Sequence, residues 1–120
     1  MTFEEYQKEV DKLLKDPERT SLELLVGQLC SEAGEAFGKL TKISRLAYKI
    51  RNQCAPIDAA IQMEQLDKDF RKELGDTQFY LAAIHILKEW ELENTAFQNI
   101  AKLQDRLARN VLTSGSGDNR

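Results

Sequence analysis

Two short stretches of this chain each carry a pair of carboxylates three residues apart, with a glycine immediately before the second. The pairs are Glu32/Glu35 and Glu73/Asp76. Residues at i and i+3 lie on one face of a helix, so each pair presents two oxygen donors to the same place. If the two helices pack antiparallel, four carboxylates meet, and such a cluster is repulsive without a cation. Oxygen donors favour a hard divalent ion, so the sequence predicts a Mg2+ site, with Mn2+ as the alternative ion.

Glycines distinguish these two pairs from a third. Carboxylate pairs arise by chance in a chain with 20 acidic residues, and Glu64/Asp67 has the same spacing without a glycine. Gly34 and Gly75 lie inside helical patterns, where each costs about 0.5–1 kcal/mol relative to alanine. Their presence predicts a close backbone approach, either between helices or to a ligand, whereas Glu64/Asp67 is predicted to be an ordinary exposed pair. The alternative is that every pair is solvated.

Helical periodicity dominates the first half of the chain. Thr-x-x-Glu patterns at Thr2 and Thr20 predict capping boxes that open the first two helices. Asp16–Pro17 ends the first helix, because the residue before proline avoids helical geometry. Apolar residues then recur at helical spacing over residues 22–50, which predicts one long helix with its acidic pair beside the apolar face. The second half of this helix is basic. These basic residues form a solvated face that complements the helix C-terminal dipole or, in the alternative interpretation, Lys39 or Lys42 lies near a phosphate.

The second half of the chain continues the same pattern. A break is predicted at 52–56, with Pro56 in the first turn of a third helix that runs to about Trp90. A corner is predicted at 91–94. A fourth helix follows, with apolar residues on one face at Phe97, Ile100, Leu103 and Leu107.

These elements predict an all-α, four-helix, bundle-like protomer with two long central antiparallel helices. No alternation typical of strands appears, and neither a P-loop nor a dinucleotide-binding glycine motif is present. The length of 120 residues fits one domain, predicted at 1–112, followed by a Gly/Ser-rich tail at 113–120.

Composition narrows the function classes. A net charge of −3 argues against a nucleic-acid-binding surface, and the chain has no signal-like apolar core or membrane-length apolar run. We therefore expect a cytoplasmic protein that binds neither nucleic acid nor membrane. Cys30 and Cys54 have no metal-type spacing and are interpreted as reduced packing residues. The single histidine, His85, is interpreted as a packed or surface residue rather than a metal ligand.

The motifs together resemble those of small MazG-like proteins in the all-α nucleoside triphosphate pyrophosphohydrolase superfamily. The stretch 31–39 resembles their first motif, and 73–76 with the aromatic residues at 79–80 resembles their second. Lys102 and Arg106 match a basic pair in the following helix, and 114–120 is similar to a tail of some short members. The resemblance covers the chain from about residue 20 onwards. The connection around 46–70 is longer than is usual in that family.

This resemblance implies a specific activity. The expected reaction is Mg2+-dependent hydrolysis of (deoxy)nucleoside triphosphates between the α and β phosphates, which yields a monophosphate and pyrophosphate. Glu32, Glu35, Glu73 and Asp76 are the implied metal ligands and catalytic residues, with the general base left open among them. The resemblance also implies a homodimer or homotetramer. The implied substrate contacts are Lys39, Lys102, Arg106, Asp118, Asn119 and Arg120.

Two alternative functions stay open at this point. The first is a helical interaction module without chemistry, in which the acidic pairs are solvated. The second is an enzyme with a narrower substrate, such as a dUTP or dCTP pyrophosphatase or a phosphoribosyl-ATP pyrophosphatase.

Overall fold

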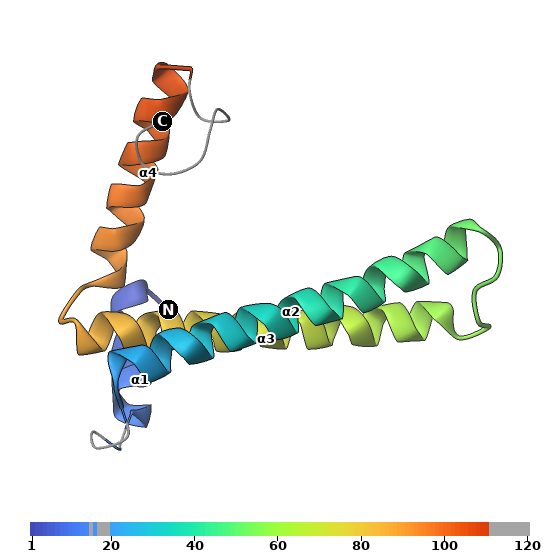
Figure 1. The fold of residues 1–120 in the computed structure, drawn as a ribbon, viewed down its shortest axis with the longest axis horizontal. Helices are drawn as coiled ribbons and strands as arrows, with labels where there is room; N and C mark the ends of the chain where they lie inside the picture. The colour runs from blue at the N-terminus through green and yellow to red at the C-terminus, as the bar shows by residue number, and fades with distance from the viewer. Residues whose placement is uncertain (15, 17–19, 111–120) are drawn as a thin grey trace.

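The computed structural model describes residues 1–14, 16 and 20–110. Within that part of the chain every regular element is a helix, which confirms the predicted all-α class (Figure 1). The elements in chain order are α1 (Phe3–Leu13), α2 (Leu22–Arg51), α3 (Ala59–Leu87) and α4 (Leu92–Ala108). The domain boundary predicted at residue 112 and the tail at 113–120 lie outside the described residues.

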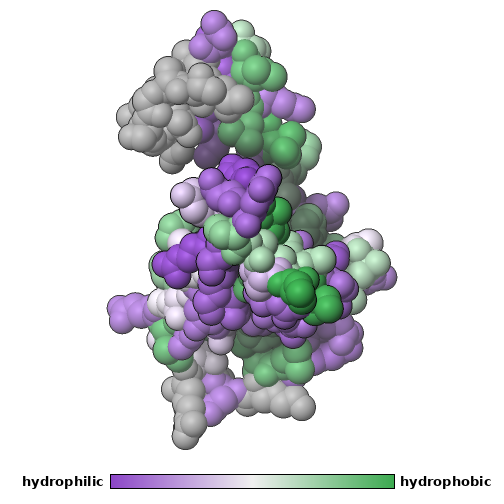
Figure 2. Space-filling model, turned by 90° about the vertical axis from the view of Figure 1, so that its right-hand side faces the viewer, coloured by the Kyte–Doolittle hydropathy of each residue, from purple (hydrophilic) through white to green (hydrophobic). Residues whose placement is uncertain are grey.

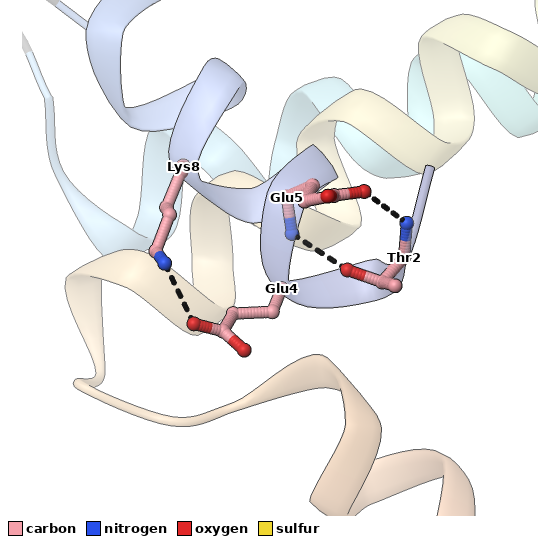
Figure 3. Close-up of polar contacts among 4 residues, drawn as sticks. All are labelled: Thr2, Glu4, Glu5 and Lys8. Atoms are coloured by element: carbon pink, nitrogen blue, oxygen red, sulfur yellow. Dashed lines mark hydrogen bonds and ion pairs between the residues drawn. The ribbon is translucent and has the colours of Figure 1, made fainter.

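The predicted capping box opens α1. The amide of Glu5 donates to the Thr2 hydroxyl at 3.1 Å, and the Thr2 amide donates to the Glu5 carboxylate at 2.7 Å (Figure 3). Lys8 adds an ion pair with Glu4 one turn away, at 2.6 Å. The helix ends at Leu13, and Pro17 lies outside the described residues.

The capping box predicted at Thr20 is wrong by one residue. The N-cap of α2 is Ser21, whose hydroxyl accepts from the Leu24 amide at 3.1 Å. Thr20 instead donates its hydroxyl to the carbonyl of Asp16, at 2.7 Å, and so belongs to the preceding connection. From Ser21 onward the helix is uninterrupted for 30 residues, a length of about 45 Å at 1.5 Å per residue.

α2 and α3 form a long antiparallel hairpin, and they are the two helices that pack most closely (Figure 1). The predicted break holds, but Pro56 does not lie in the first turn of α3. Its carbonyl accepts from the Ala59 amide at 3.1 Å, in the turn that precedes the helix. α3 ends at Leu87, and the corner before α4 occupies 88–91 rather than the predicted 91–94.

The core lies at the end of the hairpin where α1 crosses it, which we call the proximal end. Its buried members come from all four helices and are Val10, Leu25, Ala82, Ala83 and Leu92. α1 packs on α3 and on α4, whereas α4 rises away from the hairpin (Figure 1). The predicted four-helix bundle is therefore wrong for one protomer, because only α2 and α3 pack along their length. The radius of gyration is 18.6 Å, against about 13.6 Å for a compact domain of this length.

Both cysteines are free and exposed, so their predicted packing role is wrong. His85 is buried, which selects the packed one of the two predicted alternatives: its ring nitrogens lie 2.7 Å from the Leu81 carbonyl oxygen and 2.8 Å from the Thr95 hydroxyl. Among the described helices, none has the length and apolar character that crossing a membrane requires.

Candidate metal centre

Three of the four predicted ligands converge halfway along the hairpin. Glu32 and Glu35 come from α2 and Glu73 from α3, and one carboxylate oxygen of each lies within 4.8 Å of the other two. The i, i+3 spacing brings the α2 pair to one side of the helix, and the antiparallel packing brings Glu73 opposite them. Glu32 and Glu73 are half-buried and Glu35 is exposed. The three side chains thus form an open acidic cluster at the helix interface.

A lysine accompanies the cluster. The amino nitrogen of Lys39 lies 3.7 Å from a carboxylate oxygen of Glu73, and the two side chains are only 28% and 16% exposed. Lys39 follows Glu35 by one turn, so it lies on the same side of α2. Partial burial makes this cross-helix pair stronger than an ion pair in open solvent. Lys42, three residues further along α2, is exposed.

Within the cluster, Glu32 is the carboxyl group whose pKa is raised. Desolvation raises the pKa of the Glu32 carboxyl above its usual 4.5, and the negative charges of Glu35, Asp76 and Glu73 raise it further. A hydrogen bond with Glu35 acts in the same direction. Burial is thus the first cause of the raised pKa of Glu32, and the neighbouring carboxylates add to it.

Asp76 lies at the edge of the cluster. It is exposed and is not among the three carboxylates that approach one another, yet its charge contributes to the raised pKa of Glu32. Tyr6 of α1 lies beside it: burial raises the pKa of the Tyr6 hydroxyl, and the charge of Asp76 adds to that effect. No sequence pattern linked Tyr6 to the acidic pairs, because α1 reaches α3 only through the tertiary fold.

The cluster has the donor chemistry of a hard-cation site. Carboxylate oxygens are the ligands that Mg2+ and Mn2+ prefer. One carboxylate oxygen of each of Glu32, Glu35 and Glu73 already lies within 4.8 Å of the other two. The donor set therefore fits such an ion, and Asp76 is a fourth donor within electrostatic range.

The glycines do not mark contact between the two helices. A methyl group added at Gly34 or Gly75 would meet no neighbouring atom within 4 Å. The predicted close approach between helices is thus wrong within one protomer, and the approach to a ligand stays a prediction.

The remaining predicted substrate contacts are not brought to the cluster. Lys102 is exposed and Arg106 is buried, and both belong to α4, which rises away from the hairpin (Figure 1). Asp118, Asn119 and Arg120 lie outside the described residues.

A separate pocket of about 500 Å³ lies between α1 and the corner before α4. Carboxylates of Glu4, Asp11 and Glu93 line it together with Trp90, which is 53% exposed. No residue of the acidic cluster lines this pocket. Phe79 and Tyr80, which also resemble part of the family motif, pack against the core instead, with their rings edge to face.

The protein is thus all-helical, and its central hairpin carries a carboxylate cluster with a partly buried lysine. Its sequence is similar to that of the Gene 37 protein of Mycobacterium phage L5. The two sequences are 37% identical over 92 residues, which cover 77% of this chain and 70% of the relative. The chain belongs to the family of that phage protein. No protein-family model and no solved structure matches the chain.

Proposed function

We propose that this protein is a Mg2+-dependent nucleoside triphosphate pyrophosphohydrolase. The observation that carries the proposal is the convergence of Glu32, Glu35 and Glu73 from two helices, with Lys39 beside them. An interaction surface has no need for three carboxylates within 4.8 Å of one another, since their mutual repulsion destabilises the fold. A site that binds a cation and a polyanion together does need them.

The proposed chemistry is hydrolysis of the bond between the α and β phosphates. Mg2+, when bound, neutralises the phosphates and acidifies a water molecule. The carboxylates of Glu32, Glu35, Glu73 and Asp76 hold the ion, and one that is left free accepts the proton of the attacking water. The water oxygen adds to the α phosphorus, the bridging oxygen leaves with the β phosphate, and the products are the monophosphate and pyrophosphate.

Lys39 has two successive partners in this scheme. Without substrate its amino group pairs with Glu73 at 3.7 Å. With substrate, in this proposal, the amino group turns to a phosphate oxygen, because a lysine is a compact charge on a flexible stem. Lys102, Arg106 and the segment 118–120 are proposed as further phosphate contacts on the strength of the family resemblance. The homodimer or homotetramer belongs to the proposal as well.

The decisive experiment is a product assay over the common dNTPs and NTPs with Mg2+, which measures pyrophosphate and monophosphate separately. Release of pyrophosphate is the expected result. Phosphoribosyl-ATP is added to the panel, so that hydrolysis of a single compound would identify a narrower enzyme, such as a dUTP, dCTP or phosphoribosyl-ATP pyrophosphatase. Millimolar Mg2+ should also raise the melting temperature, because the ion binds only the folded cluster. Absence of both effects would exclude the enzyme and favour a non-catalytic helical interaction module.

A further inference from the structure

The far end of the hairpin, where α2 passes into α3, projects from the rest of the molecule. We call residues 48–62 the hairpin tip. Among the described elements only α2 and α3 reach it, because α1 crosses at the proximal end and α4 rises away (Figure 1). The core lies at the proximal end and the acidic cluster halfway along, so neither uses the tip. The tip belongs to the connection around 46–70, whose length the proposed function leaves unexplained.

Every large apolar side chain of the hairpin tip is exposed. Ile57, in the connection, is fully exposed, and Ile61 of α3 is 71% exposed. Tyr48 and Ile50, in the last turn of α2, are 60% and 44% exposed. Figure 2 views the molecule from this end and shows hydrophobic atoms bordered by hydrophilic ones. Apolar side chains gathered in this way at one projecting end mark an interaction site.

Four cations lie at the tip or within three turns behind it. Their side chains are exposed and form no hydrogen bond or ion pair within the part of the chain that the structure describes. Asp58 is the single acidic residue of the stretch 42–61, and its carboxylate accepts from the Gln62 side chain at 2.8 Å. This stretch has a net charge of +3, against −6 for the remainder of the chain. The four cations are Lys42, Arg45, Lys49 and Arg51.

This local charge restricts the class of partner. The net charge of −3 averages over the whole chain and therefore gives no sign of a basic, apolar end. Contact between the tips of two copies would bring the cations of both copies face to face. Nucleic acid supplies negative charge, but it is bound through basic, polar and aromatic side chains rather than through isoleucines. A bilayer with anionic lipid supplies both the negative charge and an apolar interior.

The order of side chains along the hairpin matches the layers of a bilayer surface. Ile57 lies in the connection at the very end, and Tyr48 lies within one turn of the end of α2. Tyrosine is enriched at the boundary between hydrocarbon and headgroups. From Arg51 back to Lys42 the cations extend over about 13 Å of helix. A tip that enters the bilayer by about 5–10 Å would leave these cations beside the headgroups.

We propose that the hairpin tip inserts its exposed apolar side chains into the surface of a bilayer that contains anionic lipid. The cations of α2 hold the tip there by pairing with the headgroups. The contact is peripheral, since only the end of the hairpin enters the bilayer. It involves neither the acidic cluster nor its chemistry, so its failure would leave the proposed hydrolase untouched.

Sedimentation of the full chain with vesicles tests the proposal. The wild type should bind vesicles of equal amounts of phosphatidylcholine and phosphatidylglycerol, but not vesicles of phosphatidylcholine alone. Ile57→Ser should lower the partition coefficient at least about tenfold, because it removes the aliphatic side chain at the end of the tip. Phe97→Ser is the matched control, since Phe97 is 74% exposed but lies on α4. Absence of binding, equal binding to both vesicles, or equal loss in the two variants would overturn the proposal.

A second pair of variants tests the cations. Arg51→Gln should lower the partition coefficient about fivefold, and rising salt should weaken the binding of the wild type. Lys12→Gln removes the same charge from α1, where Lys12 pairs with Glu9, and it should bind as the wild type does. Equal losses in these two variants would show that net charge, and not the tip, controls binding, and would contradict the proposal.

The two cysteines provide a test that leaves the apolar side chains of the tip unchanged. Both are exposed and free; Cys54 lies in the tip, and Cys30 lies about 32 Å back along α2 from Arg51. A polarity-sensitive fluorophore on Cys54, in a Cys30→Ser variant, should shift its emission to shorter wavelength with the anionic vesicles. The same fluorophore on Cys30, in a Cys54→Ser variant, should not shift. A shift at neither position, or equal shifts at both, would exclude insertion by the tip.

Discussion

α3 carries two acidic pairs of identical spacing, and the structure treats them differently. Glu64 is 69% exposed in its side chain and pairs with Lys68 of its own helix at 2.9 Å. Glu73 is 16% exposed and pairs with Lys39 of the other helix. The difference lies in the face of α3 that each occupies, since only Glu73 points toward α2. The i, i+3 spacing brings two carboxylates to one face of a helix, but only a face that packs against a second helix brings them together with other charged side chains.

Neutralising one carboxylate of each pair tests whether only the pair that faces α2 is functional, and it has the largest expected effect. Glu73→Gln should reduce pyrophosphate release by at least about a hundredfold, because it removes a ligand of the proposed ion. Glu64→Gln is the matched control and should retain activity within about twofold, as expected for an exposed surface charge. The measurement is initial rate with saturating Mg2+, and equal loss in the two variants would remove the distinction between the pairs.

The lysines offer a second, smaller comparison. Lys39→Gln should lower the free energy of unfolding of the metal-free protein by about 1 kcal/mol, because it leaves a half-buried carboxylate cluster without its cation. Lys68→Gln should cost no more than about 0.5 kcal/mol, since its pair with Glu64 is exposed. Urea unfolding in the presence of EDTA measures both. If the Lys68 variant is the less stable, the cross-helix pair does not stabilise the hairpin.

Helix propensity at the glycines gives a third test. Gly34→Ala should raise the free energy of unfolding by about 0.5–1 kcal/mol, because an added methyl meets open space and alanine is the better helix former. A loss of Mg2+-dependent activity in a stable Gly34→Ala variant would show that the glycine admits a ligand, as the sequence predicts.

The smallest expected effect is on the pH dependence of stability. The pKa of Glu32 is raised in the folded protein, so between its usual value of 4.5 and the raised value the folded state binds more protons than the unfolded state. The metal-free protein should therefore lose stability as pH rises through that window. Glu32→Gln should flatten this part of the profile, and Glu64→Gln should leave it as in the wild type. Urea midpoints at a series of pH values provide the measurement, and a profile unchanged by Glu32→Gln would contradict this origin.

Sequence periodicity was sufficient to predict the helices and the convergence of three carboxylates, because both follow from residue spacing within α2 and α3. It did not predict where α4 begins or in which direction it runs. Residues 91–94 look like a corner by composition, yet the structure begins α4 at Leu92 without a capping side chain at Glu91. The bundle-like expectation failed for a related reason. Apolar residues such as Phe97 predict that a face will be covered, but not whether the covering helix belongs to the same copy.

The start of α4 depends instead on a side chain from the other end of the chain. The Gln7 side-chain oxygen accepts from the Leu92 amide at 3.1 Å, and its nitrogen donates to the Trp90 carbonyl at 2.6 Å. A residue of α1 thus supplies the cap that the local sequence of α4 lacks.

That bridge has a consequence for the expected order of folding. Gln7 and Leu92 are separated by 85 positions in sequence, and contacts of such separation form late because loop closure opposes them. We therefore expect the contacts between α2 and α3 to form before the bridge from Gln7 to the start of α4. On this expectation α4 acquires its direction last, when its first turn meets α1.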